Sequence, residues 1–547
     1  MEYKTKSLLE ELNHVLDNSE KVIINPRREY TITKSIDRGE AIKTEHGCVA
    51  TWSPDNSTGR SPADTYIVDS LEVHNTIDWK SKSNKPLSSD TFCRLYDNAL
   101  EILSTKKEIY VTNRAIGADE GYALQVDTIS SSPLVSLFTY NMFRDIPDGI
   151  EDSVFNGEFK IIVLPYDKID SNKYPGLLNN NSSMVIATDF TKRVGIVIGS
   201  SYLGTVKKLA FTAMNFYLPH HNILPLHCSA NVDDKGNVSI FLGLSGTGKT
   251  TLSTEPTRKL LGDDEHGWSD NGVYNFENGC YVKTLNLTEE REPEIYRALF
   301  EEKNHLKNGA ILENTMVYPN GRVDLSDERL SVNGRASYPL NVLENAQSAS
   351  KAGHPRTILF LTADACGVLP PISKLEIDQA KLWFLMGYTS KIPGTESGIT
   401  EPIATFSRFF GEPFMPSRPS IYMKLLGDKM EKYNTNVYLL NTGWIGGVYG
   451  KGGERISLKY TRAMVRAANE GLLENVEFER ENYFDLSIPK NCPGVPSQIL
   501  NPVKSWEDKG AYEKEARKLA DKFASHFKND FGTHPIDKKI IAFCPGL

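Results

Sequence analysis

The sequence predicts an α/β protein, and three observations support this prediction. Short apolar runs typical of buried strands, such as "FKIIVLPY" and "RVGIVIG", alternate with helical patterns along the chain. Hydrophobic residues make up 39% of the chain and charged residues 24%, which is typical of a globular protein. A length of 547 residues exceeds one ordinary hydrophobic core and therefore predicts more than one domain.

The first part of the chain mixes strands and helices. Residues 1–176 contain strand-like runs such as "EIYVT" and helical patterns such as "RLYDNALEIL". "MVIATD" and "RVGIVIG" then predict buried strands, and residues 205–218 predict an amphipathic helix. "PHHN" interrupts this helix, so we expect a domain boundary near residue 222, with domains of residues 1–222 and 223–547.

The second part begins with a predicted hairpin. "PLHCSANV" and "NVSIFLGL" are strand-like and are joined by Asp-Asp-Lys-Gly, a sequence typical of a tight turn. The last clear helix is expected at about residues 507–528. Its apolar face would consist of Tyr512, Ala516, Leu519, Phe523 and Phe527.

Charge and cysteine content exclude several classes of protein. The formal net charge of −8 argues against nucleic acid as the main partner, because such proteins usually carry a basic face. No run reaches the roughly 18 apolar residues of a membrane span, so we expect no membrane partner. The seven cysteines include no C-x-x-C pair, which favours free thiols and a cytoplasmic location.

A glycine-rich stretch, "FLGLSGTGKTTLST" at 241–254, suggests a phosphate-binding loop. Gly243 to Thr250 match G-x-x-x-x-G-K-[ST], and "VSIFL" before them predicts a strand. A strand–turn–helix order lets backbone N–H groups face an anion. Lys249 would reach the β- and γ-phosphates, and the Thr250 hydroxyl would bind Mg²⁺. The alternative is a glycine-rich turn that only connects two elements.

An acidic pair follows the loop. "KLLGDDEHGW" places Asp263 and Asp264 after a short apolar run. A carboxylate in this position is the second metal-holding element of a phosphate-loop site. The alternative is a solvated acidic turn.

Other stretches supply cations and further candidate ligands. "STGRSP" contains Arg60, "SYLGTVKK" contains Tyr202, Lys207 and Lys208, "LHCSAN" contains His227, and "NGRASYP" contains Arg335. Taken singly, each has a structural explanation: a solvated arginine, a lysine pair on a helix surface, or a core histidine bonded to backbone.

Taken together, these stretches and the glycine loop resemble the ATP-dependent phosphoenolpyruvate carboxykinase family. Further matching stretches are "GCYVKT", "LTADACGVLPP", "GTESGITEP", "NTGW" and "RISLKYTR", in the same order over roughly residues 55–465. The first 50 and last 80 residues match only loosely. The resemblance implies a reversible reaction of oxaloacetate and ATP to phosphoenolpyruvate, CO₂ and ADP. It also implies two α/β lobes, the second carrying the mononucleotide-binding phosphate loop, with the active site in the cleft between them.

The resemblance also implies roles for single residues. Lys208, His227 and Asp264 would hold Mn²⁺, and Mg²⁺ would accompany ATP on Thr250, with Asp263 in its outer coordination sphere. Arg60 and Arg335 would clamp substrate carboxylates beside Tyr202, and Lys208, Lys249, Arg60 and Arg335 would be the catalytic residues. The nucleotide-binding residues would be Gly243, Leu244, Ser245, Gly246, Thr247, Gly248, Lys249, Thr250, Thr251, Lys283, Glu292, Arg335, Arg455, Ile456 and Thr461.

"GTESGITEP" resembles the family's lid, at about residues 391–402, with Gly394 and Gly398 as hinges. A lid suits this chemistry because the enolate must be phosphorylated before water protonates it.

Three other functions compete with this interpretation. A GTP-dependent carboxykinase carries a cysteine in its phosphate loop, where this chain has Ser245-Gly246-Thr247-Gly248. A protein-phosphorylating kinase would explain Lys249 and Asp264 but not the arginines. A non-catalytic nucleotide-binding regulator would need a degraded site, and no expected residue is missing. The sequence is compatible with a homo-oligomer.

Overall fold

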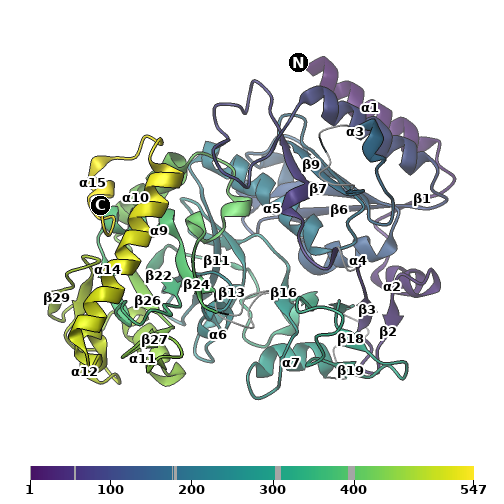
Figure 1. Ribbon diagram of the computed structural model, residues 1–547. Coiled ribbons are helices and arrows are strands. Elements are labelled where there is room, and N and C mark those ends of the chain that lie inside the picture. Colours follow the sequence, from purple (N-terminus) through teal and green to yellow (C-terminus); the bar gives the residue numbers. More distant parts are fainter. Residues whose placement is uncertain (1, 55–56, 175–176, 178–181, 302–308, 392–400) are drawn as a thin grey trace. The chain divides into compact units, whose positions relative to one another are not determined.

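The computed structural model describes residues 2–54, 57–174, 177, 182–301, 309–391 and 401–547. It divides into two compact units (Figure 1). The first comprises residues 1–217 and 275–346, and the second comprises residues 218–274 and 347–547. Both units mix helices and strands, which confirms the predicted α/β class. The expected division into two continuous segments differs from these units, because residues 275–346 belong with the first.

The first unit contains a sheet of eight described strands. Its central strands β7, β8 and β10 are parallel neighbours, and β9 runs antiparallel to β10. The order is β1 (Val22–Ile24), β6 (Ile109–Ile116), β7 (Leu124–Ser130), β8 (Phe159–Leu164), β10 (Val194–Ile198), β9 (Val185–Asp189), β4 (Thr65–Val68) and β5 (Pro86–Leu87). The predicted strands "EIYVT", "FKIIVLPY", "MVIATD" and "RVGIVIG" are confirmed as β6, β8, β9 and β10.

Helices complete the first unit. The predicted helix "RLYDNALEIL" lies within α3, which starts after Ser88, whose hydroxyl accepts the Thr91 N–H. The predicted helix at 205–218 is confirmed as α5, and its residues are largely buried. The helices are α1 (Glu2–Asp17), α2 (Arg28–Asp37), α3 (Ser89–Ser104), α4 (Pro133–Met142), α5 (Gly204–Tyr217) and α7 (Pro293–Phe300).

A second sheet explains why residues 275–346 join the first unit. Strand β17 pairs in parallel with β3, which lies near the N-terminus, and β20 pairs with β17 and β16. The order is β16 (Gly279–Lys283), β20 (Arg335–Pro339), β17 (Ile311–Glu313), β3 (Val49–Thr51) and β2 (Ile42–Lys43). The periodicity of a sequence cannot predict a pairing between strands so far apart in the chain.

The second unit is built on a sheet of eleven described strands. The predicted hairpin is confirmed: β11 and β12 pair antiparallel, with Val232 opposite Val238. The order is β21 (Lys351–Ala352), β15 (Val273–Asn275), β14 (Glu265–Trp268), β11 (Leu224–Val232), β12 (Val238–Leu242), β22 (Pro355–Thr362), β26 (Asn436–Asn441), β23 (Ile372–Leu375), β30 (Ser487–Pro489) and β29 (Phe478–Arg480), with β13 (Lys259–Gly262) on β11.

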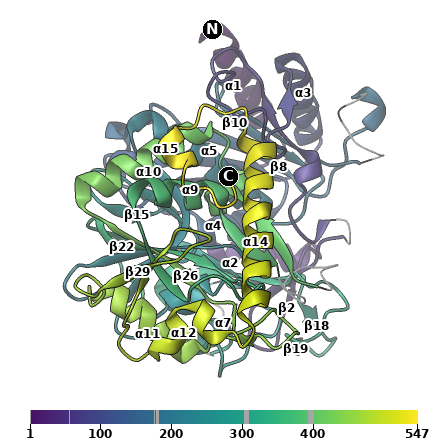
Figure 2. The same cartoon turned by 60° about the vertical axis from the view of Figure 1, so that its left-hand side comes forward.

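Both faces of the central strands β12, β22 and β26 are buried, as is usual for parallel strands. Ile240 of β12 packs in a cluster with α9 (Ile377–Met386), α10 (Pro419–Tyr433) and α14 (Lys509–His526). Its neighbour Phe241 packs in another cluster, with α11 (Leu458–Asn469). The long helix α14, yellow in Figure 2, confirms the last predicted helix, and all five predicted apolar residues are buried. Among the described helices, none is long and apolar enough to cross a membrane.

Candidate active site

The glycine-rich stretch forms a tight loop between β12 and the short helix α6 (Lys249–Ser253). Gly246 and Gly248 have φ of +86° and +91°, a region that favours glycine. At Gly243, a Cβ atom would lie 2.4 Å from Thr247 Oγ1 and 2.9 Å from Leu361 Cβ. The glycines are therefore required by the local conformation and packing, as a phosphate-cradling loop demands.

The expected nucleoside-binding stretch is attached to this loop. The Thr442 hydroxyl donates to the carbonyl oxygen of Thr247 at 2.9 Å. The Thr442 carbonyl in turn accepts the Arg455 Nε–H at 3.2 Å, and the Arg455 guanidinium lies 5.3 Å from the ring centroid of Trp444. The neighbouring candidates Ile456 and Thr461 are buried.

Three candidate side chains converge beside the loop. His227 lies on β11, and Asp264 lies between β13 and β14. Asp264 Oδ1 is 2.9 Å from His227 Nε2 and 3.1 Å from Lys249 Nζ. Lys249 Nζ is also 3.3 Å from His227 Nε2. The histidine, the carboxylate and the loop lysine thus form one cluster.

The second ring nitrogen of His227 fixes its tautomer. Nδ1 lies 2.6 Å from the carbonyl oxygen of Phe410, which can only accept, so Nδ1 carries the proton. Burial, and then the charge of Lys249, lower the pKa of His227 and favour the neutral ring. A neutral ring protonated at Nδ1 presents a lone pair at Nε2, which is the form that binds a metal ion.

The cluster fits a divalent cation. Ligand atoms of His227, Asp264 and the buried Glu265 all lie within 4.8 Å of one another. One imidazole nitrogen with carboxylate oxygens is a donor set used by divalent ions of the Mg²⁺ and Mn²⁺ kind. Asp263 is buried next to them, and its carbonyl oxygen accepts the Ser229 hydroxyl at 2.6 Å. Glu265 was not among the sequence-predicted ligands.

In the first unit, Asn333 links two of the predicted arginine regions. Arg335 donates from Nε and Nη2 to Asn333 Oδ1, at 3.2 and 3.1 Å. Asn333 Nδ2 donates to the carbonyl oxygen of Thr58 at 2.9 Å, two residues before the exposed Arg60. The structure therefore brings the Arg60 loop to Arg335, and Asn333 is a residue that the sequence interpretation missed.

Tyr281 lies close to further candidate site residues of the first unit. Tyr281 lies between the predicted residues: its ring centroid is 6.1 Å from that of Tyr202 and 5.7 Å from the Arg335 guanidinium carbon. Lys283 is the direct cross-strand partner of Arg335 in the β16–β20 pair. Tyr202 and Arg335 therefore lie next to Tyr281, and Lys283 lies two residues further along the same strand.

Beneath Tyr281 lies the buried Glu313, a second residue that the sequence interpretation missed. Its carboxylate accepts the Leu203 N–H at 2.8 Å and the Tyr281 hydroxyl. Burial raises the pKa of Glu313 to about 7. An acidic residue within the apolar run "AILENT" was the available signal, because buried carboxylates are rare without a specific partner.

The two neighbouring lysines of α5, Lys207 and Lys208, lie in different environments. Lys207 is buried and its Nζ lies 2.7 Å from the carboxylate of the equally buried Glu277. The alternative of a surface lysine pair is therefore wrong for Lys207. The Lys208 ammonium lies 5.5 Å from the ring centroid of Phe211.

The predicted residues are divided between the two units. The first contains Arg60, Tyr202, Lys208, Lys283, Glu292 and Arg335, and Glu292 immediately precedes α7. The second contains the loop with Thr250 and Thr251 in α6, together with His227, Asp263, Asp264, Arg455, Ile456 and Thr461. Most of the expected lid lies outside the described residues, and the strands β24 (Tyr388–Lys391) and β25 (Ile403–Phe406) that flank it pair antiparallel.

Comparison with known proteins gives a consistent result. The family model described as phosphoenolpyruvate carboxykinase matches residues 20–498. A phosphoenolpyruvate carboxykinase (ATP) of Alkaliphilus oremlandii is 48% identical over 472 residues, which cover 86% of this chain and 87% of the relative. The protein of the same name from Geobacillus kaustophilus is 46% identical over 511 residues, covering 93% and 94%.

Proposed function

Because this chain belongs to the ATP-dependent phosphoenolpyruvate carboxykinase family, we propose that it converts oxaloacetate and ATP into phosphoenolpyruvate, CO₂ and ADP. The reaction is reversible and serves gluconeogenesis or, in reverse, CO₂ fixation. The observation that carries the proposal is the cluster of His227, Asp264 and Lys249 beside the phosphate loop. It unites a metal-binding group with a phosphate-binding lysine, and the reaction needs both.

Decarboxylation requires groups that bind the substrate carboxylates and a group that stabilises the negative charge of the enolate. Arg60 and Arg335 hold the carboxylates of oxaloacetate, a task suited to planar guanidinium groups, and Tyr202 lies beside the substrate or the departing CO₂. His227, Asp264 and Lys208 would hold a divalent cation, Mn²⁺, which would supply Lewis-acid stabilisation of the negative charge that develops on the enolate oxygen. Asn333 and Tyr281 position Arg335, and Glu313 positions Tyr281.

Phosphoryl transfer then requires the phosphate loop. The loop residues Gly243 to Thr251 cradle the phosphates, and Lys249 neutralises charge on the transferred group. Thr250 would hold the Mg²⁺ that accompanies ATP, and Asp263 would contribute to the same ion less directly. Lys283, Glu292, Arg455, Ile456 and Thr461 line the rest of the nucleotide site. The hydrogen bond from the Thr442 hydroxyl to the Thr247 carbonyl supports a common site for the nucleoside and the phosphates.

The reaction also needs a shared, closed site. We infer that residues of both units act on the same substrates, and that the expected lid at about residues 391–402 closes during the reaction. Closure excludes the water that would protonate the enolate. The seven free cysteines support the expected cytoplasmic location.

The direct test is a coupled assay of oxaloacetate-dependent ADP formation. ATP and GTP are compared as phosphoryl donors, with Mg²⁺ alone and with Mg²⁺ plus Mn²⁺. We expect turnover with ATP, a clearly lower kcat/KM with GTP, and stimulation by Mn²⁺. Equal turnover with GTP would overturn the nucleotide assignment, and the absence of turnover with both would overturn the function.

A further inference from the structure

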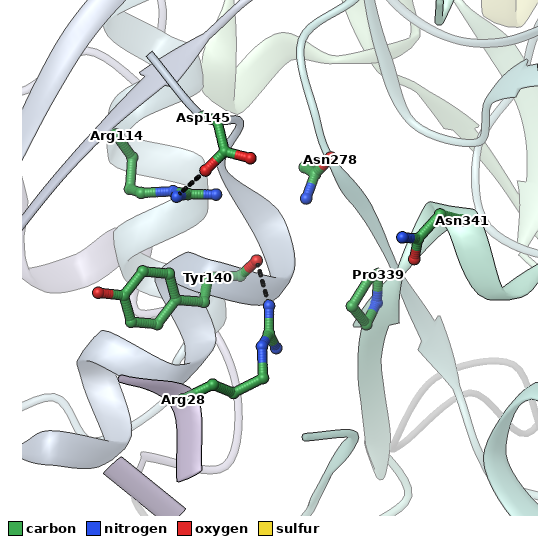
Figure 3. A pocket seen from close by; sticks show the side chains of 7 residues that line it. All are labelled: Arg28, Arg114, Tyr140, Asp145, Asn278, Pro339 and Asn341. Carbon is green, nitrogen blue, oxygen red and sulfur yellow. Dashed lines mark hydrogen bonds and ion pairs between the residues drawn. The ribbon is translucent and has the colours of Figure 1, made fainter. Parts of the chain in front are cut away.

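The first unit contains a cavity that the proposed reaction does not use. Its volume is about 390 Å³, within the usual range for small-molecule sites. One wall carries Arg28, Arg114, Tyr140 and Asp145, and the other carries Asn278, Pro339 and Asn341 (Figure 3). Its polar lining indicates a polar ligand.

The arginine wall is held in place by backbone. Tyr140 lies between the two arginines in Figure 3, and its ring centroid is 5.7 Å from the Arg28 guanidinium carbon and 5.1 Å from that of Arg114. Arg28 Nη2 donates to the Tyr140 carbonyl oxygen at 3.1 Å, and Arg114 Nη2 donates to the Phe143 carbonyl oxygen at 3.2 Å. Both guanidinium groups are therefore positioned before any ligand arrives.

The lining of this wall includes two guanidinium groups and one carboxylate. Arg114 pairs with Asp145, but the Asp145 side chain is 89% exposed, so solvent screens this pair. Burial, and then the charge of Arg114, lower the pKa of Arg28. Burial, and to a lesser extent the charge of Arg114, lower the pKa of Arg144 to about 10, so Arg144 is a third cation near Arg114 and Asp145. Within the part of the chain that the structure describes, the buried Nε of Arg114 has no hydrogen-bond acceptor.

The opposite wall adds neutral donors. The carboxamides of Asn278 and Asn341 face the cavity across from the arginines in Figure 3. Asn278 is fixed by its backbone, because its N–H donates to the Met142 carbonyl and its carbonyl accepts the Leu340 N–H at 2.7 Å. Guanidinium forks on one side and amides on the other suit a ligand with several anionic oxygens.

We propose that this cavity binds a small organic dianion, carrying either a phosphate group or two carboxylates, at a site separate from the candidate active-site residues. A divalent anion offers several oxygens, which would accept hydrogen bonds from the guanidinium groups of one wall and the carboxamides of the other. The cavity accommodates a compact metabolite and is too small for a macromolecular chain.

The position of the cavity links it to the candidate substrate residues. In the β16–β20 pair, Gly279 lies opposite Pro339 at the cavity end, and Lys283 lies opposite Arg335 at the other end. Arg28 also donates to the Asn141 carboxamide, whose Nδ2 donates to Ser337 Oγ of β20 at 3.2 Å. A ligand that binds Arg28 would thus be connected, through Asn141 and Ser337, to β20, the strand that carries Arg335. If the proposed function holds, the dianion changes the KM for oxaloacetate.

The test uses charge changes at Asn341, which is exposed and lies outside the proposed catalytic machinery. Inorganic phosphate and malonate are titrated separately into the full-length protein by calorimetry. Asn341→Asp should weaken binding of the probe at least about tenfold and Asn341→Lys should strengthen it, because charge across the cavity repels or attracts the anion. Asn75→Asp, an exposed change of the same charge in the same unit, should leave the affinity unchanged.

The two probes distinguish the ligand classes, since phosphate alone indicates a phosphate ester and malonate alone indicates a dicarboxylate. Failure of both probes to bind the wild type would overturn the proposal. The proposal would also be overturned if the wild type and both Asn341 variants bound the probe with the same affinity, because the probe would then bind elsewhere. Binding is measured without turnover, so this outcome is independent of whether the proposed reaction occurs.

Discussion

Arg335 donates two hydrogen bonds to the carboxamide oxygen of Asn333, and the amide nitrogen of Asn333 reaches the backbone of Thr58. One side chain therefore holds a candidate substrate arginine and the loop that carries another, Arg60. The oxygen fixes the guanidinium plane, and the nitrogen fixes the loop. Asn333 is a positioning residue, and its removal should affect substrate binding before it affects the nucleotide.

Replacing Asn333 tests this role. Asn333→Ala should raise the KM for oxaloacetate about tenfold or more, because each lost hydrogen bond contributes about 1 kcal/mol to holding the arginines. The KM for ATP should change less than about twofold if the nucleotide binds elsewhere. Steady-state kinetics with each substrate varied in turn measure both. Asn75→Ala is the matched control, and an equal rise in both KM values would contradict a substrate-specific role.

The buried Glu313 gives a pH-dependent prediction. Its pKa is raised to about 7, so the folded protein binds a proton at pH values where the unfolded chain, at about 4.5, has lost it. This group's contribution to stability is fully present below about pH 4.5 and is lost as the pH rises through about 7. Glu313→Gln cannot ionise, so its stability relative to wild type should rise over that window, by up to about 3 kcal/mol.

Urea denaturation at a series of pH values measures the Glu313 effect. The exposed Glu151→Gln variant serves as the control and should follow the wild-type pH profile. Parallel profiles for the wild type and Glu313→Gln would mean that the carboxylate remains ionised in the folded protein.

Local patterns were enough to predict much of the fold. The hairpin of β11 and β12 and the apolar face of α14 follow from alternation and helical spacing over a few residues. The pairing of β17 with β3 joins residues about 260 positions apart, and no local pattern encodes it. This pairing is the reason that a single boundary near residue 222 does not describe the units.

The candidate site was predictable only where a motif marks it. The phosphate loop, Asp264 and the arginines stand in recognisable stretches, whereas Asn333, Glu313 and the Phe410 carbonyl act through contacts between distant segments. The backbone carbonyl of Phe410 is invisible to sequence reasoning, because every residue has one. It nonetheless selects the tautomer in which His227 can bind a metal.

The loop lysine separates the two half-reactions. Lys249→Met should reduce phosphoenolpyruvate formation by about 10³-fold, since a positioned cation on the transferred phosphoryl group stabilises the transition state by about 4 kcal/mol. Decarboxylation of oxaloacetate to pyruvate should survive in part, because it depends on the divalent cation and the arginines. Product analysis of both reactions, with the exposed Lys259→Met as control, makes the comparison. Unchanged phosphoenolpyruvate formation would remove the loop from the mechanism.

Lys208 gives the most specific prediction, because it concerns a lysine as a metal ligand. An amine binds a cation only through its lone pair, so Mn²⁺ binding through Lys208 would release a proton, and the Mn²⁺ affinity should therefore rise with pH. His227 should contribute little to this rise above neutral pH, since burial already lowers its pKa. Lys208→Arg keeps a positive charge but offers no lone pair, and should weaken Mn²⁺ binding at least about tenfold while ATP–Mg²⁺ binding stays nearly intact.

Electron paramagnetic resonance of free Mn²⁺ during titration measures this affinity in the wild type, in Lys208→Arg and in the exposed control Lys235→Arg. His227→Gln should lose affinity at every pH, because it removes the nitrogen that Phe410 orients. Lys208→Arg should instead remove the pH-dependent part. If Lys208 only contacts phosphate or substrate as a cation, the arginine variant will bind Mn²⁺ as the wild type does, with the same rise with pH. That result would leave His227 and Asp264 as ligands and exclude the lysine.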